Sequence, residues 1–157
     1  MAVDKFMSNG TQKGFSMIEL LVAIGIITVT LTSLLGVINF SLRLMILTKE
    51  TTLATVMVQE GFEAVRSIRD NDWTKLIDGN HGLTSVAGEW DFLGTENVIS
   101  GFTRKILIES VSRNPATDDI EETYNSSNND PDTKKIIAIV SWKGKEIKIA
   151  TYLTNWK

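Results

Sequence analysis

Residues 13–38 read KGFSMIELLVAIGIITVTLTSLLGVI, and this stretch decides how the chain is organised. From Leu20 to Ile38 it contains no charged residue. As a helix rising about 1.5 Å per residue, that run would extend roughly 29 Å. This length matches the hydrocarbon core of a bilayer and predicts a membrane-spanning helix. Glu19 sits beside the run, and its carboxylate would be costly to place in lipid unless it has a specific role.

The rest of the 157-residue chain is polar and fits one folded domain attached to the apolar segment. The net charge is −3 and the basic residues are dispersed, so no specific nucleic-acid partner is predicted. The absence of cysteine excludes disulfides and thiolate chemistry. His81 is the only histidine, and no serine has an evident histidine–acid partner. The sequence therefore predicts no catalytic residue and a protein that is not an enzyme.

Two bland explanations of the apolar run compete with a more specific one. The apolar region of a secretory signal peptide is about 7–15 residues long and ends in a small-residue cleavage site. The run here is longer and no clear A-x-A pattern follows it. An uncleaved single-pass anchor explains the length but leaves Glu19 as an unexplained cost. Basic residues flank the run on both sides, so the positive-inside rule does not fix its orientation.

The residues from Lys13 to Leu21 resemble the prepilin cleavage and methylation signal of type IV pilins and pseudopilins. They comprise a basic residue, Gly, Phe, a small polar residue, two apolar residues, Glu and the start of an apolar run. In that family a membrane peptidase cuts after the Gly and methylates the new N-terminal residue. The resemblance implies a leader of residues 1–14 that ends in Lys13 and Gly14, cleavage between Gly14 and Phe15, and N-methylation of Phe15.

The resemblance also gives Glu19 a role, because it becomes the fifth residue of the mature chain. In pilin-like filaments the glutamate at that position is thought to neutralise the N-terminal amine of an adjacent subunit. A charge in apolar surroundings is tolerable only when paired, and cleavage would create an ammonium at Phe15. The implied charge pair could form within one chain before assembly or between chains in the filament. We favour the intersubunit pair, although the sequence alone does not separate the two.

By this resemblance the chain is a structural subunit of a type IV pilus or of a related type II secretion or DNA-uptake pseudopilus. Its implied partners are the prepilin peptidase/methyltransferase, other pilin subunits, the inner-membrane assembly platform and, before assembly, membrane lipid. It would be a single-pass protein of the inner (cytoplasmic) membrane with an extracytoplasmic head, and later part of an extracellular or periplasmic filament. The lack of a cysteine pair favours a minor pilin. The alternative is a single-pass, membrane-tethered binding module whose head captures a ligand or partner.

The helical pattern continues beyond the apolar run, because no proline precedes Pro115 and apolar residues recur at three- and four-residue steps. A helix is predicted over residues 16–70. Residues 15–42 form its transmembrane or filament-core part, and residues 43–72 form an amphipathic stem. Gly61 should weaken this stem by about 1 kcal/mol relative to alanine, and we expect it to permit a bend or a close contact with a sheet.

Residues 73–157 contain short alternating segments punctuated by glycine, which predicts an antiparallel β head. The expected fold class is α+β, with the long N-terminal helix packed against a small pilin-like sheet of three to five strands. Hairpins are expected around Ala87-Gly88 and around residues 143–145. Three of the four tryptophans are expected in the core, and the fourth, Trp156, is left open. The three are Trp73, Trp90 and Trp142.

The segment 118–134, DDIEETYNSSNNDPDTK, is polar and acidic, and it predicts a mobile, solvated loop. Calcium takes six to eight oxygen ligands, so a calcium site is possible here, although the spacing of an EF-hand is absent. Some pseudopilins carry calcium in a C-terminal loop. No other cofactor is predicted. The candidate residues for a metal or for a protein partner are Asp118, Asp119, Asp130 and Asp132.

Overall fold

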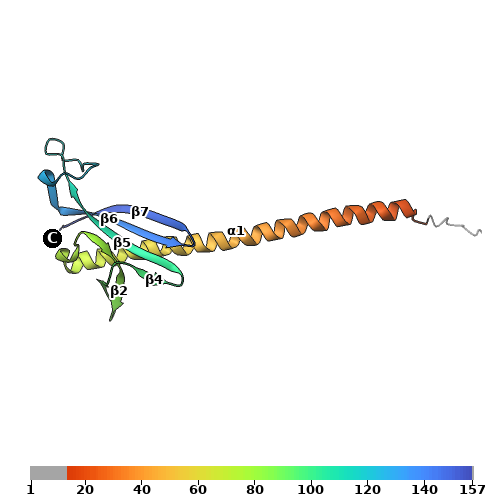
Figure 1. Ribbon diagram of the computed structural model, residues 1–157, viewed down its shortest axis with the longest axis horizontal. Coiled ribbons are helices and arrows are strands. Elements are labelled where there is room, and N and C mark those ends of the chain that lie inside the picture. The colour runs from red at the N-terminus through yellow and green to blue at the C-terminus, as the bar shows by residue number, and fades with distance from the viewer. Residues whose placement is uncertain (1–13, 157) are drawn as a thin grey trace, which may run out of the picture. The chain divides into compact units, whose positions relative to one another are not determined.

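The computed structural model describes residues 14–156, which form one helix followed by antiparallel strands, an α+β fold (Figure 1). The helix α1 spans Met17–Asn71 without interruption, within one residue of the predicted bounds at each end. The chain divides into two compact units, Met1–Leu47 and Thr48–Lys157, and α1 contributes to both. Lys13 and the preceding residues of the expected leader lie outside the described residues.

The first unit contains the apolar part of α1. The side chains from Met17 to Leu47 are all exposed, which is unusual for so apolar a surface. Its polar side chains bond back to the helix. Thr28 Oγ1 donates to the carbonyl of Ile24 at 2.8 Å, and Ser33 Oγ donates to that of Val29 at 2.8 Å. The segment therefore presents hydrocarbon outward and satisfies its hydroxyl donors internally.

The second unit is built on a five-stranded antiparallel sheet in the order β1-β5-β6-β7, with β4 also paired to β5. A separate two-stranded sheet is formed by β2 (Leu83–Val86) and β3 (Glu89–Phe92). Short 3-10 turns cover Trp73–Lys75 and Ser126–Asn128. The strands of the larger sheet are β1 (Gly79–His81), β4 (Asn97–Ile99), β5 (Phe102–Ser112), β6 (Asn129–Trp142) and β7 (Lys145–Thr154).

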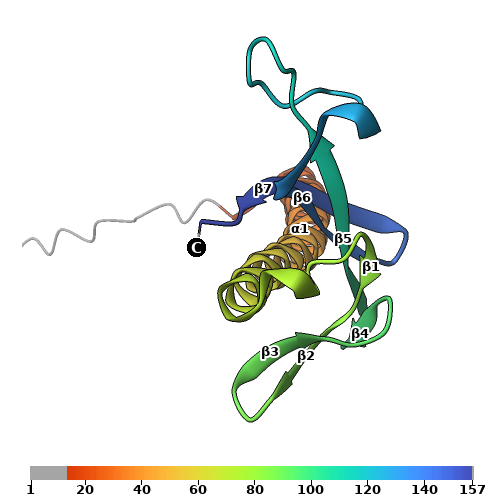
Figure 2. The same ribbon diagram turned by 90° about the vertical axis from the view of Figure 1, so that its left-hand side faces the viewer.

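In this unit the strands β5, β6 and β7 lie along one side of α1 (Figures 1 and 2). The alternation of β5 places every second side chain from Phe102 to Ile108 in the core, as a sheet with one covered face requires. The facing part of α1 buries residues at three- and four-residue steps between Ala54 and Ile68. Apolar side chains from both elements form one core cluster. The predicted packing of the stem against an antiparallel sheet is confirmed.

Gly61 lies at a close approach between helix and sheet. A Cβ added there would lie 3.1 Å from Ile106 Cδ1 and 3.9 Å from Ala138 Cβ. The expected close contact is therefore present. Next to it lies Arg104, which is 2 % exposed and whose Nη1 is 3.0 Å from Glu60 Oε2 on α1. Sequence analysis did not identify this ion pair between a buried arginine and a half-exposed glutamate.

Both predicted hairpins are present. β2 and β3 pair around Ala87-Gly88, and β6 and β7 pair around Lys143-Gly144, where both turn residues have positive φ, 44° and 75°. Two positive φ angles define the turn that matches the twist of a hairpin, and glycine supplies the second at no steric cost.

The predicted loop over residues 118–134 is wrong in its second part, because residues from Asn129 onward belong to β6. Ser112 pairs with Asn129 and Val111 with Asp130, whereas Ser110 pairs with Lys134. The intervening residues form a bulge that accommodates Pro131, which has no N–H to give to the ladder. The acidic composition predicted a loop, but a bulge allows the same residues to join the sheet.

The prediction that three tryptophans lie in the core is confirmed only in part. Trp142 is 5 % exposed and belongs to the core. Trp73 and Trp90 are half-buried and pack against the core from its margin. Trp156 is 65 % exposed, with the Arg69 guanidinium 5.9 Å from its ring centroid.

Candidate functional site

The expected processing site lies where the chain enters α1. Gly14, Phe15 and Ser16 precede the helix, and Phe15 is 90 % exposed. The backbone N–H of Ser16 donates to Glu19 Oε2 at 3.3 Å, and the N–H of Leu20 donates to the Ser16 carbonyl at 3.2 Å. The peptide bond between Gly14 and Phe15 therefore lies before the helix, and both residues are exposed.

Glu19 therefore acts as a cap for its own helix. The order Ser-x-x-Glu over residues 16–19 is the sequence signature of a capping box, in which the glutamate reaches back to the N–H of the first residue. The carboxylate also lies in the first helical turn, where the helix dipole favours negative charge. Sequence analysis missed this role, although the four-residue signature was there to be read.

The surface behind the cap determines what surroundings this segment needs. α1 is long and apolar enough to cross a membrane, and none of its most apolar window is buried. Leu20, Ile24 and Leu31 are each more than half exposed. Leaving so many apolar side chains in water is unfavourable by roughly 1.5–3 kcal/mol for each large one. The segment is therefore suited to lipid or to other apolar helices.

The aspartates proposed for a metal or a partner divide between the loop and β6. Asp118 and Asp119 lie in the loop after β5, and their carbonyls accept hydrogen bonds from Arg113 Nη1 and from a backbone N–H, each at 2.8 Å. Asp130 and Asp132 lie on β6. The structure does not bring the four carboxylates together: within residues 14–156, no three acidic or histidine side chains are grouped to hold a metal ion.

Arg113 explains how these residues are held. Its Nε lies 2.7 Å from Asp130 Oδ2, and its Nη2 lies 3.3 Å from Thr133 Oγ1. Burial acts to raise the pKa of Asp130, but hydrogen bonds from Thr133 and Arg113 outweigh it and hold that pKa below its ordinary value. Asp132 accepts from Asn155 Nδ2 at 3.2 Å. The Arg113 guanidinium thus pairs with the carboxylate of one of the four candidate aspartates, Asp130, and with the backbone carbonyl of another, Asp118.

The single histidine has a structural environment. His81 Nε2 lies 2.7 Å from the carbonyl of Ile77, and its ring packs against Phe92 with centroids 4.6 Å apart. The ring contact connects β1 to β3 of the separate hairpin.

Comparison with known proteins identifies the N-terminal segment. A family model described as the prokaryotic N-terminal methylation motif matches residues 9–35, which contain the capped helix start and most of the apolar run. No curated protein and no solved structure matches the chain. Proteins of this motif family are structural, and the motif implies processing by a prepilin peptidase, assembly with other pilins and anchoring in a membrane. With this motif and the long apolar helix behind it, the chain fits a type IV pilin-like protein.

Proposed function

We propose that this chain is the precursor of a filament subunit, a minor pilin of a type IV pilus or of a related secretion or DNA-uptake pseudopilus. It is not an enzyme but the substrate of one. The peptidase cuts after Gly14 and methylates Phe15. The observation that carries the proposal is the exposed apolar part of α1, most of which lies within the methylation motif. Such a surface can be covered first by lipid and then by the helices of neighbouring subunits.

In this proposal the subunit waits in the inner membrane with its N-terminus toward the cytoplasm and its head outside. The assembly platform then moves it into the filament. The absence of cysteine supports a minor pilin, because the chain departs in this from major pilins whose C-terminal loop is closed by a disulfide.

The cap at Glu19 supports the charge pair. Its carboxylate contacts the N–H of Ser16, one residue after the position at which cleavage would create the Phe15 ammonium. Pairing within the chain therefore needs little movement while the subunit is in lipid. On assembly the carboxylate exchanges this partner for the ammonium of a neighbour, which keeps both charges paired in apolar surroundings.

Mass spectrometry of the mature N-terminal peptide tests the processing step. We expect a chain beginning at methylated Phe15 when a prepilin peptidase is co-expressed, and an intact leader without it. A Gly14→Val variant should remain uncleaved. Gly10→Val is the matched control, because it makes the same change within the leader but away from the bond. An intact leader in the wild-type chain with active peptidase present would refute the proposal.

Two substitutions separate the cap from the charge pair. Glu19→Gln keeps an acceptor for the Ser16 N–H but removes the charge, whereas Glu19→Ala removes both. If the charge pair drives assembly, both variants should be processed normally and both should be lost from sheared filaments. If Glu19→Gln enters filaments as well as the wild type, the pairing proposal is wrong and Glu19 serves only as a cap.

A further inference from the structure

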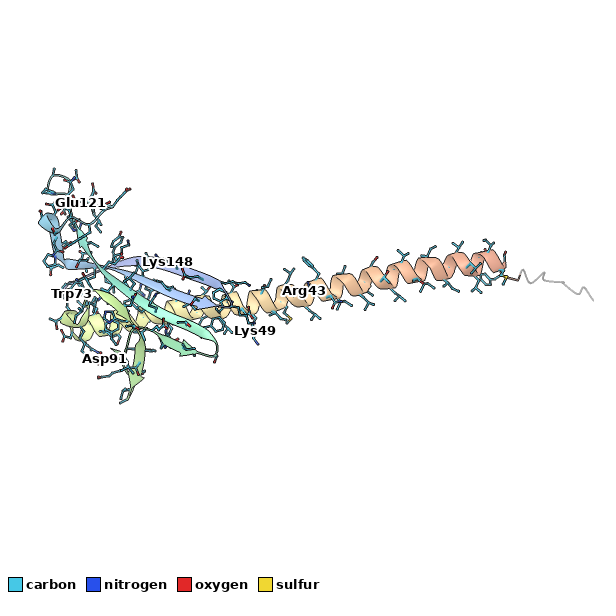
Figure 3. All side chains as sticks on the ribbon, in the orientation of Figure 1. Arg43, Lys49, Trp73, Asp91, Glu121 and Lys148 are labelled. Carbon is cyan, nitrogen blue, oxygen red and sulfur yellow. The ribbon has the colours of Figure 1, made fainter. Side chains whose placement is uncertain are left out.

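A pocket of about 310 Å³ lies in the head, where the end of α1 meets the end of β7. Its lining includes Asp72 and Trp73, which follow α1, and Asn155 and Trp156, which follow β7. Figure 3 labels Trp73 at this end of the head. All of these residues belong to the second unit. A volume of this size is at the lower end of the range for small-molecule sites.

The indole of Trp156 supplies an aromatic surface in this pocket. Trp156 is 65 % exposed, and the Arg69 guanidinium lies over one face of its ring, with Cζ 5.9 Å from the centroid. Arg69 is itself anchored, because its Nη2 lies 2.8 Å from Asp70 Oδ1. The guanidinium therefore stabilises the ring from one face and leaves the other face open to a ligand.

Polar groups with unused hydrogen-bonding capacity line the same pocket. Asp72 Oδ1 accepts from the backbone N–H and the hydroxyl of Thr74, at 2.9 and 2.7 Å, but among residues 14–156 its Oδ2 has no hydrogen-bond partner. The side-chain amide of Asn71 has none within that range either. Asn155 Nδ2 donates to Asp132 Oδ1 at 3.2 Å, which leaves the Asn155 Oδ1 available. Asn71 and Asp72 are exposed and Asn155 is half-buried, so a ligand in the pocket can reach all three.

These features favour a neutral, hydroxylated ligand over other classes. An apolar ligand would remove water from the carboxylate and the amides without replacing the lost hydrogen bonds. The Arg69 guanidinium over the ring would repel a second cation, and the Asp72 carboxylate would repel an anion. A pyranose ring avoids these costs. Its faces carry C–H groups that pack on the electron-rich face of an indole, and its edge carries hydroxyls that both donate and accept.

We propose that this pocket binds a neutral sugar residue of a glycan, stacked on the open face of Trp156. The hydroxyls of the sugar bond to Asn71, Asp72 and Asn155, and Trp73, which packs against the core, lines the pocket on the core side. One stacked ring and a few hydrogen bonds predict a Kd of about 1–10 mM for a monosaccharide. The proposal goes beyond filament assembly and holds whether or not the chain is cleaved after Gly14.

Nuclear magnetic resonance titration of the full chain, in micelles of a detergent without a sugar headgroup, tests this proposal. The probes are methyl β-glucopyranoside and methyl β-galactopyranoside. Sorbitol, which has the hydroxyls without the ring, and cyclohexanol, which has a ring with a single hydroxyl, are the matched controls. The chain has four tryptophans and therefore four indole N–H signals, and the signal lost in Trp156→Ala is that of Trp156. At least one glycoside should shift this signal and leave that of the buried Trp142 in place.

Three results of the titration would overturn the proposal. The first is no shift with either glycoside at about ten times the expected Kd. The second is a shift with sorbitol or cyclohexanol as large as with the glycosides, because hydroxyls or an apolar ring alone would then be sufficient. The third is tighter binding of tetramethylammonium chloride than of the glycosides, which would make the pocket a cation site.

Substitutions locate the binding groups. Trp156→Ala removes the stacking surface and should abolish the glycoside-induced shifts of the backbone amide signals of residues 71–73 and 155. Tyr152→Ala is the matched control, because it removes a half-exposed aromatic ring from β7 outside the pocket and should leave binding unchanged. Asn71→Ala should weaken binding about fivefold, whereas Asn80→Ala, at an exposed position on β1, should not. Equal affinity in Trp156→Ala and Tyr152→Ala would refute the assignment.

Discussion

Replacing Gly61 with valine tests how closely α1 approaches the sheet. A Cβ at this position would lie 3.1 Å from Ile106 Cδ1 and 3.8 Å from Arg104 Cδ. The first distance is shorter than the separation of about 3.5–4.0 Å at which carbon atoms attract best. Ile106 is fully buried, so it has no free space into which to withdraw.

Two opposing terms set the size of the effect. Removing glycine from a helix interior stabilises the helix by up to about 1 kcal/mol, and by less when the replacement is β-branched. Overpacking a core costs about 1–3 kcal/mol. For Gly61→Ala the two terms nearly cancel. For Gly61→Val, with two further methyl groups against the sheet, we expect a net destabilisation of about 2 kcal/mol, which corresponds to a Tm lower by roughly 8 °C.

The assay is thermal unfolding of the full chain in detergent, followed by the fluorescence of the tryptophans, of which Trp142 reports from the core. Gln59→Val is the matched control, because it places the same branched side chain on α1 at an exposed position. Its cost should stay within about 0.5 kcal/mol. If Gly61→Val unfolds at the same temperature as Gln59→Val, the close helix–sheet approach is wrong.

Three further outcomes are expected. In denaturant titrations, Glu60→Met should lower the free energy of unfolding of the head by about 1–2 kcal/mol more than Arg104→Met does. Glu60→Met leaves a buried guanidinium without its partner, whereas in Arg104→Met the half-exposed Glu60 can be hydrated. The reverse order would contradict the burial of Arg104. The pKa of Asp130 is depressed in the folded chain, so its contribution to stability is complete above its unfolded pKa near 4 and is lost as pH falls through the lower folded pKa. Asp130→Asn should therefore flatten the loss of Tm in acid. An unchanged acid profile would count against the pair with Arg113. Calcium should raise the Tm of the full chain by no more than magnesium does, because Arg113 already neutralises Asp130. A rise in Tm that is specific to calcium and is removed by Asp118→Asn would instead support a calcium site in this loop.

The sequence predicted the elements whose signals are local. The helix bounds followed from apolar spacing and from the absence of proline, and the hairpins followed from glycine-containing turns such as Lys143-Gly144. The role of Gly61 was also readable, because a glycine inside a strong helical pattern needs a packing reason.

What the sequence could not predict depends on partners far apart in the chain. Arg104 is buried because Glu60 meets it from an element 44 residues earlier, and no spacing rule connects the two. The bulge at Pro131 depends on how β5 ends, so acidic composition alone favoured a loop. The capping box at residues 16–19 is a local signal that could have been predicted, but Glu19 was interpreted only as one half of a charge pair.

The hydroxyl groups of the apolar helix have a thermodynamic consequence. Because Thr28 and Ser33 already donate to carbonyls of their own helix, moving the helix between two apolar environments breaks none of these bonds. Such a transfer exchanges one set of dispersion contacts for another of similar strength, so its free energy is small and its direction easily reversed. The work of moving such a helix in one direction must therefore be supplied from outside the helix.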